Sequence, residues 1–189
     1  MPEPLDPGDV RTGAAYEEVR SGERQSLVEA QRHRRVSLGT SLELVFESRD
    51  SVRLALEEML RSERVSDPDV IAGDAAAFSE LIPGEGRIGA TLYVIAGDAA
   101  ELGTTLSGLA DVRAAVYLEI DGKRVPGEVL DDEAAEQMSA ASFVTFRLSP
   151  ELRERWRRGA AIVAGVEHPR HAERSTLTDE QRAAIAEGL

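Results

Sequence analysis

Residues 114–129 read AAVYLEIDGKRVPGEV, and this stretch decides the fold class. Residues 114–120 carry the aliphatic, aromatic and β-branched side chains that are typical of a strand. Asp121 and Gly122 form a pair that two-residue hairpin turns prefer, because both positions of the turn need a positive φ. Residues 123–129 follow as a second strand. The stretch therefore predicts antiparallel pairing between strands that are neighbours in sequence.

Around this hairpin, strands and helices are interspersed without the regular repeat of a parallel βαβ fold. Further strands are predicted over 35–46, as one or two strands around Gly39, and over 88–95, 142–148 and 160–166. Helices are predicted over 14–34 with a break near Ser21-Gly22, and over 52–64, 74–81, 98–109, 131–138, 149–158 and 177–189. These elements predict the α+β class, as a mixed, largely antiparallel sheet packed with several helices.

Helix 52–64 carries the clearest pattern in the chain. Val52, Leu56 and Leu60 recur at i, i+4 and i+8, which places them in one apolar stripe. Asp50 is the expected N-cap, and Asp67-Pro68 is expected to end the helix.

Composition limits the kind of protein this is. The chain has 189 residues, no cysteine and a net charge of −13. We expect a flexible arm over 1–13 and a single domain over 14–189 that ends in a C-terminal helix. No stretch resembles a signal peptide or a membrane span, so a cytoplasmic protein without membrane contact is expected. The acidic balance disfavours nucleic-acid binding, because affinity for phosphates comes from Lys and Arg.

Several segments, in order and spacing, resemble a bacterial family catalogued as domain of unknown function 3501. They are RHRRVSLG at 32–39, LVFE at 44–47, EMLRSER at 58–64, LIP at 81–83, ATL at 90–92, FVTF at 143–146 and His168-Pro169. The resemblance implies gene neighbours such as rubrerythrin-like di-iron proteins and iron–sulfur oxidoreductase subunits, and hence a redox protein as partner. This chain has Leu54-Ala55 where relatives carry a Tyr-Gln pair, and Ser142 where relatives carry a His.

An arginine cluster is the first candidate site. If strand 35–46 and helix 52–64 pack together, their guanidinium groups could converge on a small anion or a nucleotide, since arginine binds carboxylate and phosphate through two hydrogen bonds at once. The alternative is that nearby glutamates neutralise them in a structural network. The candidate residues are Arg32, Arg34, Arg35, Arg53, Arg61 and Arg64.

A metal site is the second candidate. The chain has three histidines, and a His/carboxylate site for Fe, Mn or Zn needs three or four ligands that converge. His33 and His168, with Glu57 or Glu58, form the set to look for. The alternative is that both histidines only make hydrogen bonds at the ends of strands.

Other motifs point to chemistry less strongly. No G-x-S-x-G nucleophile elbow is present. The glycines of 84–89 have the spacing of a dinucleotide fingerprint, but they precede a strand instead of following one. Trp156, flanked by arginines, could anchor a partner or pack into the core beside Leu152.

Three hypotheses therefore remain. The first is an accessory or interaction partner of a redox system, and it rests on the family resemblance. The second is a metal-dependent enzyme or metal-binding protein. The third is an anion-binding or nucleotide-binding module that uses the arginine cluster. Self-association into a homo-oligomer, for which the C-terminal helix is a candidate surface, also stays open.

Overall fold

Two antiparallel sheets form the frame of the protein, and the computed structural model describes them within residues 3–109, 111–129, 140–186 and 189. The five-stranded sheet has the order β1 (Arg35–Leu38), β2 (Leu42–Phe46), β3 (Arg87–Val94), β7 (Ala141–Arg147) and β6 (Glu128–Val129). The four-stranded sheet has the order β5 (Lys123–Pro126), β4 (Val116–Ile120), β8 (Ile162–His168) and β9 (His171–Thr176). The α+β class is confirmed.

The predicted hairpin is present between β4 and β5. Asp121 and Gly122 have φ values of 50° and 77°, and Ile120 pairs with Lys123 across the turn. The second strand is shorter than predicted, because the chain leaves the four-stranded sheet after Pro126. It continues as β6, which pairs with β7 of the other sheet. Residues 123–129 therefore connect the two sheets.

Gly127 lies at this crossing. Its backbone N–H donates to the Val116 carbonyl oxygen at 2.8 Å. A Cβ at this position would lie 2.4 Å from Cγ1 of Val144 and 3.1 Å from the Val116 oxygen. The chain can pass from one sheet to the other here because residue 127 has no side chain.

The main core fills the space between the two sheets. Alternate residues of the strands point into it, among them Leu44 and Phe46 of β2 and Leu118 of β4, all essentially without exposure. The rings of Phe46 and Phe146 lie 6.4 Å apart and are tilted by 40°, a favourable aromatic arrangement. Trp156 also packs into this core, and its Nε1 donates to the Arg182 carbonyl oxygen at 3.2 Å. Of the two roles considered for Trp156, the structure shows packing in the core.

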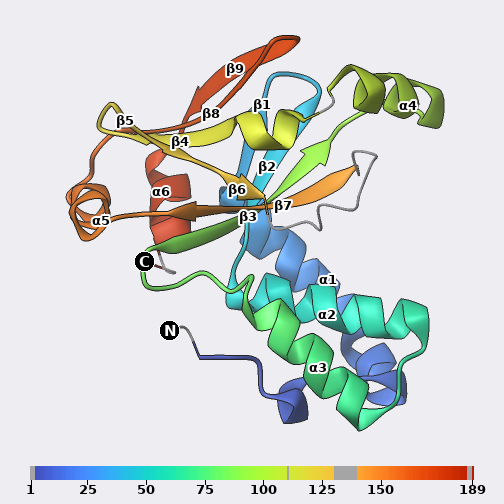
Figure 1. Cartoon of the computed structure of the whole chain (residues 1–189). Coiled ribbons are helices and arrows are strands. Elements are labelled where there is room, and N and C mark those ends of the chain that lie inside the picture. Colours follow the sequence, from blue (N-terminus) through green and yellow to red (C-terminus); the bar gives the residue numbers. More distant parts are fainter. Residues whose placement is uncertain (1–2, 110, 130–139, 187–188) are drawn as a thin grey trace.

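Three helices lie together on one side of the molecule, below the five-stranded sheet in Figure 1: α1 (Gly13–Gln31), α2 (Arg49–Glu63) and α3 (Pro68–Ser79). A second apolar cluster joins α2 and α3 to the N-terminal segment through Leu5, Val10, Val52, Leu56, Leu60, Ala75 and Ile82. The other helices are α4 (Ala99–Gly108), α5 (Pro150–Arg157) and α6 (Asp179–Ala186). Short 3-10 turns occupy Pro7–Asp9, Arg32–Arg34 and Val112–Ala115.

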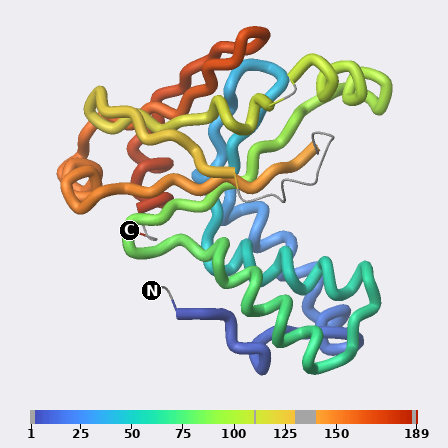
Figure 2. The backbone as a smooth tube through the Cα atoms, viewed as in Figure 1, coloured from blue at the N-terminus to red at the C-terminus, as the bar shows by residue number. Residues whose placement is uncertain are grey.

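The segment that we expected to be a flexible arm runs beside α3 (Figure 2). Leu5 and Val10 are buried, and the Leu5 N–H donates to Ser79 Oγ at 2.8 Å. The division into an arm and a single domain stays a prediction. No helix of the described residues combines the length and apolar character needed to cross a membrane.

Two helix predictions need correction. Helix α1 continues through Ser21-Gly22 without a break. The N-cap of α2 is Ser48 instead of Asp50, because Ser48 and Ser51 hydrogen-bond to each other's backbone N–H groups in a capping box.

The boundary near residue 68 also differs. Asp67 and Pro68 begin α3 instead of only ending α2, since Asp67 caps the helix and Pro68 occupies its first turn. The helix predicted over 131–138 lies outside the described residues. The predicted helix after Ser149 is confirmed, and Thr178 and Gln181 form a capping box at the start of the last helix.

The crossing at Gly127 gives a test of the fold. Gly127→Ala should destabilise the protein by about 1–3 kcal/mol, because the new methyl group meets Val144 in a filled core. Gly73→Ala is the control, since Gly73 is exposed in α3 with open space around it. That change should stabilise the helix by about 0.5–1 kcal/mol. Urea unfolding of both variants measures the difference, and equal stabilities would contradict the role given to Gly127.

Candidate functional site

The predicted arginine cluster does not converge on one point. Arg35 forms an ion pair with Glu43 across β1 and β2, and Arg32 lies 3.7 Å from Glu29. The side chain of Arg34 is buried and donates to the Glu47 carbonyl oxygen at 3.2 Å.

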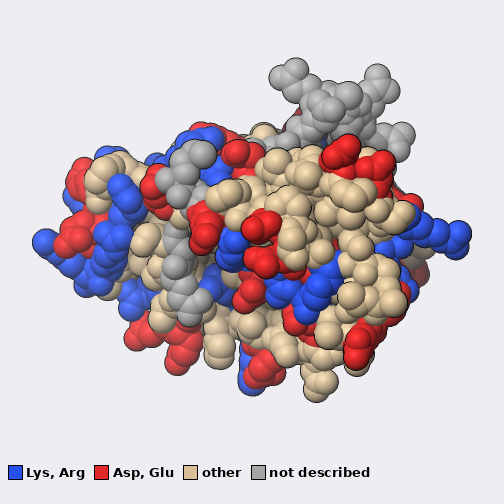
Figure 3. All heavy atoms as spheres, turned by 90° about the horizontal axis from the view of Figure 1, so that it is seen from below, with Lys and Arg blue, Asp and Glu red and all other residues tan. Residues whose placement is uncertain are grey.

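The other three arginines of that set lie on or at the end of α2. Arg61 pairs with Glu17 of α1, and Arg53 pairs with Glu23 and Glu57. Arg64 is the exposed C-cap residue of α2, in the left-handed conformation. Basic and acidic side chains are interspersed over much of the face that Figure 3 shows. The structure therefore places five of the six guanidinium groups in local structural contacts instead of around a common anion.

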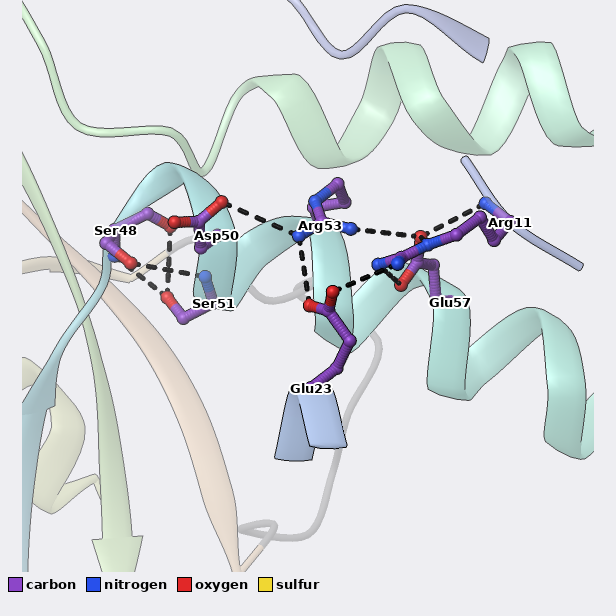
Figure 4. A network of polar contacts seen from close by, with 7 residues as sticks. All are labelled: Arg11, Glu23, Ser48, Asp50, Ser51, Arg53 and Glu57. Atoms are coloured by element: carbon purple, nitrogen blue, oxygen red, sulfur yellow. Dashed lines mark hydrogen bonds and ion pairs between the residues drawn. The ribbon is translucent and has the colours of Figure 1, made fainter. Parts of the chain in front are cut away.

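A partly buried ion-pair network joins α1, α2 and the N-terminal segment (Figure 4). The Glu57 side chain has no exposure, and it accepts hydrogen bonds from Arg11 Nε at 3.0 Å and from Arg53 Nη1 at 3.3 Å. Both arginines also contact Glu23 of α1, at 3.0 and 3.2 Å. Hydrogen bonds to Glu23 and Glu57 raise the pKa of Arg11, so this guanidinium stays charged. Sequence reasoning missed Arg11 because it precedes the helices that it joins.

The predicted metal ligands do not form a site. His168 Nδ1 accepts from the Arg170 N–H at 3.2 Å in the β8–β9 turn, and His33 lies in the turn before β1. Arginines engage Glu57, and Glu58 accepts from Tyr16 and Arg20. Within the described ranges, no group of three or more His, Asp or Glu residues could hold a metal ion. The Fe, Mn or Zn site expected from these residues is therefore not assembled.

A cavity of about 330 Å³ lies between the five-stranded sheet and helices α1 and α2. Its lining is Arg24, Leu27, Val28, Gln31, Glu47, Ser51, Leu54, Ala55, Glu58, Thr91, Tyr93 and Phe143. Glu47, Ser51 and Thr91 are buried and mark the inner end. Val28 at 66% and Tyr93 at 38% exposure mark the mouth. The cavity has the mixed lining that small-molecule sites have, with apolar walls and a few polar groups.

Glu47 stands at the inner end of this cavity because the chain turns there from β2 into α2. Its Oε1 accepts from Thr91 Oγ1 at 2.5 Å, and its Oε2 accepts from the Ser51 hydroxyl. No ion pair among the described residues joins an Arg, Lys or His side chain to this carboxyl group, although the charge of Arg34 acts on it. Glu47, with 7% exposure, differs in this from Glu57, which has none and is paired with Arg11 and Arg53.

Burial raises the pKa of Glu47 above the ordinary value of a glutamate. Hydrogen bonds from Ser51 and Thr91 and the charge of Arg34 oppose this shift without cancelling it. A carboxyl group in such surroundings favours its neutral form, because desolvation penalises the charge.

Glu58 has the opposite tendency. Burial favours its neutral form, but hydrogen bonds from Arg20 and Tyr16 and the charges of Arg20 and Arg24 outweigh burial, and the pKa of Glu58 is lowered. The lining therefore contains a carboxyl group that favours its proton and another that favours the ionised state. Such pairs are typical of sites that move protons.

The apolar wall includes Leu54 and Ala55, the positions at which the family resemblance implies a Tyr-Gln pair. The wall is therefore less polar in this chain than that pattern implies. Ser142, the other position that departs, lies outside the lining and is buried at 1% exposure.

Comparison with known proteins gives a family and a fold. The family model described as "Protein of unknown function (DUF3501)" matches residues 4–189. No curated protein matches. The chain is similar to a novel protein of unknown function from Burkholderia pseudomallei K96243, whose crystal structure was determined at 1.90 Å. The two share 26% sequence identity over 99% of this chain and 100% of that chain, with a TM-score of 0.90.

The Arg11–Glu57 contact can be tested by stability. Arg11→Ala leaves the buried Glu57 with Arg53 alone, so the variant should lose about 3 kcal/mol of unfolding free energy. The control is Arg61→Ala, which removes a pair exposed by 38% and 51% and should cost less than about 1 kcal/mol. Urea unfolding measures both, and similar losses would show that the network is no stronger than a surface pair.

The protonation of Glu47 predicts a pH dependence of stability. Because its pKa is raised in the folded protein, its contribution is complete below the pKa of an unfolded glutamate, about 4.3, and is lost as the pH rises through the folded pKa. Glu47→Gln removes this loss, so the variant should gain on the wild type as the pH rises toward neutrality. Unfolding free energies over a pH series measure the difference, and parallel curves would be the contrary result.

Proposed function

The chain belongs to the DUF3501 family, and we propose that it binds a small, mainly apolar organic molecule in the cavity beside Glu47 and exchanges a proton with it. The observation that carries this proposal is the carboxyl group of Glu47 at the inner end of the cavity. A carboxyl group that is buried without a cationic partner costs stability, and such groups cluster at functional sites.

The surroundings of Glu47 suit a group that donates a proton and takes it back. When the proton leaves, the Ser51 and Thr91 hydroxyls donate to the two carboxylate oxygens and stabilise the negative charge. When it returns, burial favours the neutral acid. The proton goes to an acceptor atom of the bound molecule and returns from it, and no other reactant is required.

The side chains that line the cavity determine which molecules can reach the Glu47 carboxyl group. Leu27, Leu54 and Phe143 offer apolar contact, and Arg24 stands toward solvent with 57% of its side chain exposed. The cavity volume falls within the range of small-molecule sites. An apolar body with a polar atom at its inner end fits this arrangement.

A fragment screen followed by nuclear magnetic resonance tests this function. Fragments should shift the backbone resonances of residues around the cavity, such as Ser51 and Thr91, and Ala55→Trp should abolish these shifts by filling the space. Ala76→Trp is the matched control, because Ala76 lines a different cavity. If no fragment shifts these resonances in the folded wild type, the proposal fails.

A role beside a redox enzyme stays a second proposal. It rests on the family resemblance, and the exposed Val28 and Tyr93 at the mouth of the cavity favour it as apolar contact points for a partner. The wild-type protein should retain a redox protein from an extract of its host, and a Val28→Glu bait should retain less. Recovery of no redox protein by the wild-type bait would count against this role.

A further inference from the structure

The inner end of the cavity can offer the proton of Glu47 as a hydrogen-bond donor, and the chemistry of that donor defines a class of ligand. We infer that the cavity selects neutral, apolar molecules that carry a carbonyl oxygen or an equivalent acceptor at the end that meets Glu47. This inference rests on the proposed function and adds to it the chemical group that is recognised.

The count of donors and acceptors leads to this class. Ser51 Oγ lies within hydrogen-bonding distance of two acceptors, Glu47 Oε2 and the Ser48 carbonyl oxygen, the latter at 3.0 Å. Ser51 Oγ also accepts from the Ser48 N–H at 2.8 Å. Thr91 Oγ1 donates to Glu47 Oε1. The Thr91 proton is therefore directed at Glu47, and the single Ser51 proton can go to Glu47 or to the Ser48 carbonyl oxygen. When Ser51 donates to Glu47, the proton of the neutral acid is left for a ligand that supplies an acceptor.

The charges around Glu47 disfavour ionic groups at the inner end. The guanidinium group of Arg34 contacts the backbone carbonyl oxygen of Glu47, and Arg34 is not among the described residues that line the cavity. Among the described lining residues, Arg24 is the one basic side chain, and it stands at the exposed mouth. An anionic group beside Glu47 would therefore be buried without a cation, which is costly.

A cationic ligand would need a different state of the site. It would bind best if Glu47 lost its proton and formed a buried ion pair, and the desolvation of both charges would oppose this. The charge of Glu58 is already compensated by Arg20, which donates to it together with Tyr16. A carbonyl group carries no net charge and can accept the proton of Glu47, so it requires the least rearrangement.

Four probes of nearly equal shape separate these cases. Acetophenone carries the carbonyl group, isopropylbenzene replaces its oxygen with a methyl group, 1-phenylethylamine is a cation, and benzoate is an anion. At a pH where Glu47 holds its proton, acetophenone should bind the wild-type protein about tenfold more tightly than isopropylbenzene, the gain from one hydrogen bond. Titrations followed by the resonances of cavity residues measure all four affinities.

Variants at residue 47 identify the donor. Glu47→Gln keeps an N–H donor and should keep a preference for acetophenone. Glu47→Leu has no donor and should bind acetophenone and isopropylbenzene equally. If Glu47→Leu does not fold, Thr91→Val replaces it, because Thr91 supports the ionised form of Glu47 through its hydroxyl. Thr91→Val should extend the preference for acetophenone to higher pH than in the wild type.

The pH dependence of ligand preference tests the role of the Glu47 proton, because a purely structural role of residue 47 would not produce it. The charged and titratable groups around Glu47 are Arg34 before β1, Tyr93 on β3, Glu58 on α2 and Arg24 on α1. In the wild type, the preference for acetophenone should decline as the pH rises and Glu47 ionises. In Glu47→Gln, it should not change over the same range.

The outcomes separate this inference from the proposed function. Equal binding of acetophenone and isopropylbenzene to the wild type at low pH would overturn the inference and leave a small-molecule cavity. Tighter binding of 1-phenylethylamine would also overturn it, because Glu47 would then act as an anion. If none of the four probes shifts the cavity resonances at millimolar concentration while larger fragments do, the inference fails alone, and if nothing does, both fail.

Discussion

The ion pairs of Glu57 are the contacts on which the arrangement of the helices depends. Helix α1 has 19 residues, and Tyr16 is the one that is buried. It therefore has little apolar surface with which to hold its position. Arg11 and Arg53 connect the Glu57 carboxylate of α2 to Glu23 of α1, and they bring the N-terminal segment with them. Because α1 supplies one wall of the cavity, the shape of the cavity follows from a polar network instead of apolar packing.

The two buried glutamates of this region show how partners decide the role of a side chain. Glu57 meets two guanidinium groups, so its charge is compensated and the group ties helices together. Glu47 meets two hydroxyl groups and the charge of Arg34 without an ion pair among the described residues, so its charge is compensated less and its pKa is raised. Both carboxyl groups are buried, yet one forms a structural contact and the other, under the proposed function, exchanges a proton with a ligand.

Local patterns in the sequence predicted much of the fold, since turns and caps depend on few residues. The Asp121-Gly122 turn and the helix that begins after Ser149 are examples, because each needs only its own neighbours. The division into two sheets was not predictable, since it depends on Val144 meeting Gly127 from a distant strand. The candidate site was missed for the same reason. Thr91 and Glu47 are 44 residues apart, and nothing local shows that they touch.

The sequence nevertheless contained a signal at Glu47 that its neighbours obscured. The residue follows three buried side chains of β2 and comes just before Asp50, the expected N-cap of helix 52–64, where a polar residue is ordinary. Its carboxyl group points toward the helices because the strand alternation places it on the same face as Val45 and Thr91. Glu47 and Thr91 on that face are polar, although helices α1 and α2 lie over it. Buried polar residues of this kind are unusual in a sheet that is packed on both sides. A face of this kind stays polar where the helices leave a space, and the space beside Glu47 is the cavity.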